Sequence, residues 1–600
     1  MEPTGRASPE RAPASEGAAS PPPLPHIDTA RPIPPRPSPA DESLRHLLRF
    51  VYTHNPFYVI SAACVFYGLR VTFDQRQGEL DTFALLAALA AYTLLLAVTA
   101  WAIVRWGGVW QDARSLLVLV VVSLLSMSMT FDDRLVLHRS AASACFLLGL
   151  AFASLLSETL LRVLGMRLPW LYRVPYHLFL GLFFLYPLWL ASVDPLAADP
   201  STGEFDLRVR LIGFPLIAGL LVLTLWPAVR LGPWYVRANG TPWDWPLYPG
   251  VLFGLLAFGA GVRAHCLTIS FDLVPGSSGI FDWYFVVPVL LACAVLLLEA
   301  SVASRNLLAC HVAIAAPALL VYLAIPSADL PAVAADFLGQ LTDKFGSPLY
   351  WTTMAVVVYY AVAALRELPL ALHGLIAASL LATVVGHDTS DFYTLVAPRV
   401  AALLPLLVVV GWLAWRNASS RRVFVLAAVV LSWLTVWFWD TEFARFGLAI
   451  PLHLAWLVAV AIAARYRDPF ARVLRYASAT ALVCAAVLAV GGREPLFPDL
   501  GHLARLGYLA LVIAAALLTA LATRRRVYLT AGLVNFALLV VATSVELYEI
   551  LRWRVEGLKP LLWGLAFFVL AVVISLAEGG VWQSMSAWAA RFGLLRGPDG

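Results

Sequence analysis

The chain has 600 residues, of which 61% are hydrophobic and only 13% are charged, and its mean hydropathy is +0.80. These values exclude a soluble protein of several domains and indicate an integral membrane protein that crosses the bilayer many times. The formal net charge of +5 does not indicate a nucleic-acid partner, because the arginines gather in particular loops between apolar segments.

Residues 1–41 hold twelve prolines, interspersed mainly with Ser, Ala and Gly. Such a segment cannot bury enough apolar surface to offset the entropy lost on ordering, so we expect a disordered cytoplasmic tail. In the juxtamembrane segment 42–54, Leu44, Leu47, Leu48 and Val51 recur at helical spacing with basic residues between them. This pattern predicts an amphipathic helix that lies on the membrane surface.

Eighteen apolar segments follow between residues 55 and 578, each close to the ~20 residues that cross a ~30 Å hydrocarbon core. The predicted fold class is therefore an all-α, polytopic bundle of about 18 transmembrane helices with short loops. The predicted segments are 55–73, 82–104, 115–131, 140–163, 174–193, 210–230, 247–267, 281–301, 306–325, 349–366, 369–387, 398–416, 422–439, 446–464, 473–491, 505–523, 527–546 and 560–577.

The arginines predict an orientation for these helices, because Lys and Arg are enriched in cytoplasmic loops. With the N-terminus inside, the inner loops hold Arg105 and Arg114, then Arg162, Arg167 and Arg173, then Arg230 and Arg237, and further along the chain the run 524–526. Acids predominate in outer loops such as 194–206. The C-terminus also falls inside, and residues 579–600 end the chain with a predicted interfacial helix over 580–596.

Each helix that runs outward is followed by an acid at or just past its end, where the helix dipole disfavours negative charge. These nine acids are Asp74, Asp132, Asp194, Asp272, Asp329, Asp388, Asp440, Glu494 and Glu546. Two of them share a repeated pattern, Thr-Phe-Asp-x-Arg, at residues 72–76 and 130–134. A duplicated helical hairpin is one explanation of the repeat, and chance is the other.

Several of these acids have basic, aromatic or further acidic neighbours, and together they define a candidate outer-face polar site. Salt-bridged loops would have this composition, and so would an outward-facing site for a polar headgroup, a sugar or a cation, or one with a carboxylate general base. The candidate residues are Asp74, Arg76, Asp132, Asp133, Arg134, His138, Asp272, His387, Asp388, Asp391, Asp440 and Glu442.

Polar residues deep in the apolar segments are few, and the clearest are His453 and Asn535. Each is either a satisfied interhelical hydrogen bond or part of a substrate or proton site. Glu158 and Arg162 lie four residues apart and are expected to pair on one helix. Gly250 and Gly254 have the spacing that lets a second helix approach closely.

Prolines inside the predicted segments indicate kinked helices. They are Pro215, Pro288, Pro317 and Pro405.

No nucleotide, catalytic or metal motif occurs in the sequence, so neither a cofactor nor a metal is expected. Many spans, minimal loops and internal prolines favour a carrier or flippase for a lipid-linked or amphipathic solute. The first alternative is a membrane-embedded transferase that acts at the outer face on a polyprenyl-linked donor, although the first outer loop, residues 74–81, is short for such an enzyme. The second alternative is a scaffold that assembles with other membrane subunits. We expect an integral protein of the bacterial cytoplasmic membrane, with the lipid bilayer as its principal partner.

Overall fold

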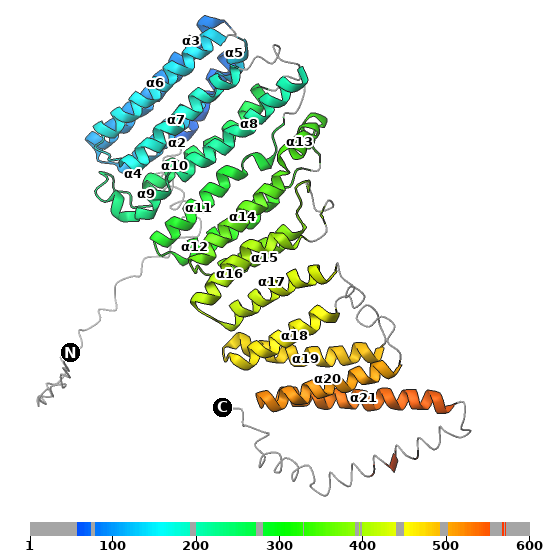
Figure 1. Cartoon of the computed structure of the whole chain (residues 1–600). Coiled ribbons are helices and arrows are strands. Elements are labelled where there is room, and N and C mark those ends of the chain that lie inside the picture. Colours follow the sequence, from blue (N-terminus) through cyan, green and yellow to red (C-terminus); the bar gives the residue numbers. More distant parts are fainter. Residues whose placement is uncertain are drawn as a thin grey trace, which may run out of the picture.

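The computed structural model describes most of the chain between residues 57 and 552 (Figure 1). The described residues are 57–73, 78–137, 139–192, 200–271, 280–327, 329–389, 395–396, 399–439, 449–491 and 502–552, with 564, 567, 568 and 571. The predicted N-terminal tail, the amphipathic helix of segment 42–54, nearly all of the last apolar segment and the helix predicted over 580–596 lie outside these residues.

The described residues form helices and contain no strand. In the first part of the chain the helices are α2 (Phe57–Phe73), α3 (Glu79–Ala102), α4 (Trp110–Met129), α5 (Asp132–Leu137), α6 (Arg139–Val163), α7 (Trp170–Ala191), α8 (Pro200–Leu223), α9 (Trp226–Leu231), α10 (Leu247–Ser270), α11 (Val287–Ala303) and α12 (Leu307–Leu323). In the second part they are α13 (Ala332–Phe345), α14 (Pro348–Leu365), α15 (Ala371–Val384), α16 (Leu404–Arg416), α17 (Ser420–Trp439), α18 (Ala449–Arg465), α19 (Pro469–Gly491), α20 (His502–Thr523) and α21 (Arg526–Arg552).

Ten helices in the described part of the chain are long and apolar enough to cross a membrane, and six apolar helices of 10–17 residues accompany them. The prediction of an all-α protein with many membrane helices is confirmed at that level. Each predicted apolar segment before residue 547 coincides with at least one observed helix. This agreement follows from the solvent, because a backbone in hydrocarbon must satisfy its hydrogen bonds within its own helix.

The helices form an elongated stack that follows the chain, from α3 and α6 at one end to α21 at the other (Figure 1). Helices α2 to α11 surround one large core in which phenylalanine rings meet edge to face, as Phe146 does with Phe131 and with Phe184. From α17 onward each helix packs mainly on helices one or two places away along the chain, and the cores are small. Function is therefore best sought in the first part, where a rigid framework can position side chains.

Two local expectations about the helices are wrong. Pro288 and Pro405 lie in the first turns of α11 and α16, where an α-helix does not use the N–H that proline lacks, so they mark the starts of helices rather than interior positions. Pro215 and Pro317 are inside α8 and α12 as expected, and α7 adds Pro175 and Pro187.

The Gly250 and Gly254 spacing does not mark a close helix contact, because a methyl group at Gly254 would meet nothing within 4 Å. The tightly packed glycine of α10 is Gly259, where a methyl group would lie 2.8 Å from the Leu125 side chain of α4.

The predicted loop 326–348 contains an additional amphipathic helix, α13. Its buried residues Ala334, Phe337 and Leu338 follow helical spacing, and Phe337 packs 6.0 Å from the ring of Phe205, which belongs to α8. The ammonium of Lys344 lies 3.8 Å from the same Phe205 ring. This helix therefore covers one end of α8.

Candidate functional site

The candidate outer-face residues that the structure describes are Asp132, Asp133, Arg134, His387 and Asp388. The other members of the predicted set lie outside the described residues: Asp74, Arg76, His138, Asp272, Asp391, Asp440 and Glu442.

Asp132, in the second Thr-Phe-Asp-x-Arg pattern, forms a buried ion pair with Arg263 of α10. Both oxygens of the Asp132 carboxylate accept hydrogen bonds from the guanidinium, one of them at 2.8 Å. The two side chains are 1% and 0% exposed, and Arg263 Nε has no hydrogen-bond partner. A carboxylate held this way is a structural link between α5 and α10 rather than a free general base.

Arg134 connects the two copies of the repeated pattern. Its guanidinium donates hydrogen bonds to the Thr82 hydroxyl of α3 at 2.8 Å and to the carbonyl of Phe73 at 3.2 Å. Phe73 is the last residue of α2, where carbonyl groups lack partners within the helix. The arginine of the second copy therefore caps the helix that ends in the first copy.

His387 and Asp388 lie in a different part of the stack, just after α15. The His387 ring is 3.0 Å from the Asp388 carboxylate and packs on Tyr350, and the Asp388 side chain is 85% exposed. Asp132 adjoins the large first core through Phe131, whereas this second group adjoins a separate core that contains Val385. The predicted outer-face residues that are described thus form two groups, not one pocket.

The two predicted intramembrane residues both make interhelical hydrogen bonds. His453 Nε2 of α18 lies 2.8 Å from the Tyr508 hydroxyl of α20. Asn535 of α21 is fully buried, and its amide nitrogen donates to the Leu482 carbonyl of α19 at 3.3 Å. The amide oxygen of Asn535 has no partner.

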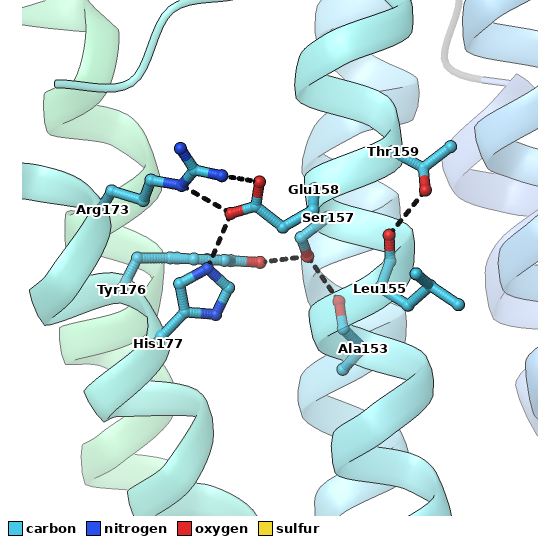
Figure 2. A network of polar contacts seen from close by, with 8 residues as sticks. All are labelled: Ala153, Leu155, Ser157, Glu158, Thr159, Arg173, Tyr176 and His177. Carbon is cyan, nitrogen blue, oxygen red and sulfur yellow. Dashed lines mark hydrogen bonds and ion pairs between the residues drawn. The ribbon is translucent and has the colours of Figure 1, made fainter. Parts of the chain in front are cut away.

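At the end of α6 that lies away from Asp132, a polar network links α6 and α7 (Figure 2). Arg173 and His177 of α7 both bind Glu158 of α6, so the expected pairing of Glu158 with Arg162 is wrong. Geometry explains the error, because α7 begins only seven residues after α6 ends and brings a closer cation across the interface. Beside this network, the Tyr176 hydroxyl lies 2.6 Å from Ser157 Oγ.

An apolar cavity of about 290 Å³ opens beside this network, between α4, α6, α7 and α10. We call it the apolar crevice. Its lining is almost wholly aliphatic and aromatic, and its one charged residue is the exposed Arg114. On the α10 side it is bordered by Leu247 and Val251, which are 56% and 41% exposed, so the crevice opens at the lateral surface of the helix bundle.

A second cavity of about 430 Å³ adjoins the crevice and shares Leu161, Met166 and Leu168 with it. We call it the basic pocket. It is lined by four arginines and a single carboxylate, that of Glu158; the arginines are Arg162, Arg167, Arg173 and Arg237.

Two loops form the wall of the basic pocket and are fixed to each other. The Arg167 N–H donates to the Asn239 carbonyl at 2.8 Å, and the buried Asn239 side chain accepts hydrogen bonds from the N–H and hydroxyl of Thr241 at 2.7 and 2.8 Å. Gly240 has φ +77° and its Cα lies against the carbonyl of Gly165, where a methyl group would clash. Only glycine fits this contact.

Sequence reasoning missed this pair of cavities, although it identified the arginines that line one of them. It interpreted Arg162, Arg167, Arg173 and Arg237 as markers of cytoplasmic loops. Two facts could have directed attention here: these arginines fall in two loops predicted on the same side, and the only acid near the end of helix α6 is Glu158.

No group of His, Cys, Asp and Glu within the described residues has the arrangement of a metal site. In comparisons with known proteins, no protein-family model, no curated protein and no solved structure matches this chain.

Proposed function

We propose that the protein is a carrier or flippase for a lipid-linked or amphipathic solute. The observation that carries the proposal is the apolar crevice, which adjoins the basic pocket and reaches the surface of the bundle beside α10. An amphipathic molecule needs an apolar environment for its chain and a polar one for its headgroup. A groove that opens toward lipid allows the hydrocarbon chain to enter from the bilayer. Internal prolines in α7, α8 and α12 add support, because they weaken helices at points where a carrier must bend.

The finer topology belongs to the same proposal: about 18 spans, both termini on the cytoplasmic side, and a location in the bacterial cytoplasmic membrane. The loops 105–114, 162–173 and 230–247, all predicted to be cytoplasmic, approach one another in the structure. Trp110 and Trp243, for example, meet edge to face at 5.6 Å. Labelling of single cysteines introduced at Val109 and at Asp388, in a variant that lacks the six native cysteines, tests the orientation, since the two exposed positions should react from opposite sides of the membrane.

Flux in proteoliposomes tests the function itself. The purified chain should accelerate movement of fluorescent lipid analogues between leaflets, measured by quenching from outside. Val121→Trp fills the apolar crevice and should reduce that rate at least about tenfold, a loss equivalent to about 1.4 kcal/mol. Val98→Trp, on a lipid-exposed face of α3, is the matched control and should leave the rate within about twofold of wild type. The proposal fails if a broad panel of lipids and solutes moves no faster than in empty vesicles.

A further inference from the structure

The charges of the basic pocket indicate which headgroup it would accept. Within the described residues, the side chains of Arg162, Arg167 and Arg237 make no hydrogen bond or ion pair, and all three are exposed around one cavity. The carboxylate of Glu158 is already bound by Arg173 and His177, so it does not neutralise them. Three guanidinium groups around one cavity without a carboxylate partner repel one another and favour an anion.

The geometry of the guanidinium group favours phosphate among common anions. Its planar set of N–H donors matches the oxygens of a phosphate in a bidentate arrangement, and each such bond is charge-assisted. Basic pockets between helices at the cytoplasmic surface are typical binding places for phosphate-bearing lipid headgroups. A phosphomonoester carries about −1.5 to −2 charges at neutral pH, which suits three arginines better than a singly charged phosphodiester does.

The adjoining crevice limits the apolar part of the ligand. Its volume of about 290 Å³ lies just below the ~300–1,000 Å³ range of ligand pockets, so the crevice itself has room for part of one hydrocarbon chain rather than two. The shared residues Leu161, Met166 and Leu168 place the chain directly beside the headgroup.

We propose that the basic pocket binds the phosphate or diphosphate headgroup of a single-chain lipid whose hydrocarbon chain lies in the apolar crevice. This inference rests on the proposed function and specifies its substrate class. Because the two loops that carry Arg167 and Arg237 are fixed to each other, the headgroup would meet a preformed site.

Native mass spectrometry of the full-length protein in detergent tests the proposal with three probes: a polyprenyl diphosphate, the corresponding polyprenol, and phosphatidic acid. Wild type should bind the polyprenyl diphosphate at least about tenfold more tightly than either of the others. The triple variant Arg162→Gln/Arg167→Gln/Arg237→Gln should lose this preference. The matched triple variant Arg465→Gln/Arg467→Gln/Arg472→Gln removes three exposed arginines from the α18–α19 end and should keep it.

Every other result of this experiment would contradict one specific part of the proposal. If the pocket variant keeps the preference, or both triple variants lose it equally, the headgroup site is not the basic pocket. If phosphatidic acid binds as tightly as the polyprenyl diphosphate, the single-chain assignment is wrong. All six arginines are exposed, so the variants should fold, and equal melting temperatures would verify it. Flux of neutral lipids by wild type, without any phosphate preference, would overturn this inference while leaving the proposed function standing.

Discussion

The first and last parts of the helix stack are packed in different ways. Helices α2 to α11 pack in several layers around one continuous core, and that core contains the fully buried Arg263 and its partner Asp132. Helices α17 to α21 follow one another with three small cores and bury no ion pair among their described residues. We call α2 to α11 the layered part and α17 to α21 the serial part. A buried charge requires partners that are held in place from several sides, so the layered part can hold specific polar sites, whereas the serial part holds isolated hydrogen bonds.

The largest effect should come from breaking the buried ion pair of the layered part. Asp132→Ala leaves the Arg263 charge buried and unpaired, which destabilises a protein by about 3–5 kcal/mol. Thermal unfolding in detergent measures the loss. The double variant Asp132→Leu/Arg263→Met should recover most of the stability, because no charge then remains buried. If the single and double variants were equally unstable, the pair would not be the cause.

Gly240→Ala should be next in size, because it disturbs the contact between the two loops of the basic pocket. The positive φ and the clash with the Gly165 carbonyl together cost about 2–3 kcal/mol. Gly254→Ala is the control, since its added methyl group meets no atom within 4 Å. Equal melting temperatures for the two variants would show that the loop contact is not rigid.

In the serial part, Asp468 shows what a surface polar link contributes. Its carboxylate accepts a hydrogen bond from the Ala471 N–H at 2.8 Å at the start of α19, and others from the N–H and hydroxyl of Ser420 at the start of α17. Asp468→Ala should destabilise the protein by about 0.5–1 kcal/mol at neutral pH, the lower part of the range for helix caps because Asp468 is partly exposed.

The contribution of Asp468 should depend on pH. The Ser420 hydroxyl, together with the backbone N–H groups of Ala471 and Ser420, holds the pKa of this carboxyl below its usual value. A lowered folded-state pKa adds stability above the unfolded pKa of about 3.9 and loses it as the pH falls through the folded value. The difference between wild type and Asp468→Ala should therefore disappear in acid. A constant difference down to pH 3 would contradict the link.

The smallest effect should follow Asn535→Leu in α21. The substitution removes one long hydrogen bond to Leu482 and also removes an amide oxygen that has no partner. The two changes oppose each other, so stability should stay within about 1 kcal/mol of wild type. A loss above about 2 kcal/mol would show that the serial part also depends on a buried polar residue, and the contrast between the two parts would not hold.

The sequence predicted the helices well and their polar contacts poorly. Apolar length alone locates a membrane helix, which is why α3 and α20 coincide with their predicted segments. The partner of Glu158, by contrast, depends on how α7 turns back on α6. The amphipathic spacing of Ala334, Phe337 and Leu338 was present in the sequence, but a short helix in a polar segment is not distinguished by hydropathy. The basic pocket joins loops about 70 residues apart, a separation that no local pattern contains.

The Asp132–Arg263 pair also has a consequence for biosynthesis. The two residues are 131 positions apart, and the chain grows at about 5–20 residues per second, so Asp132 emerges roughly 7–26 seconds before its partner. During that interval the carboxylate has no arginine to accompany it into the bundle. We therefore expect the ends of α4 and α6 near Asp132 to stay hydrated until α10 arrives, so that this contact forms only after α10 has been made.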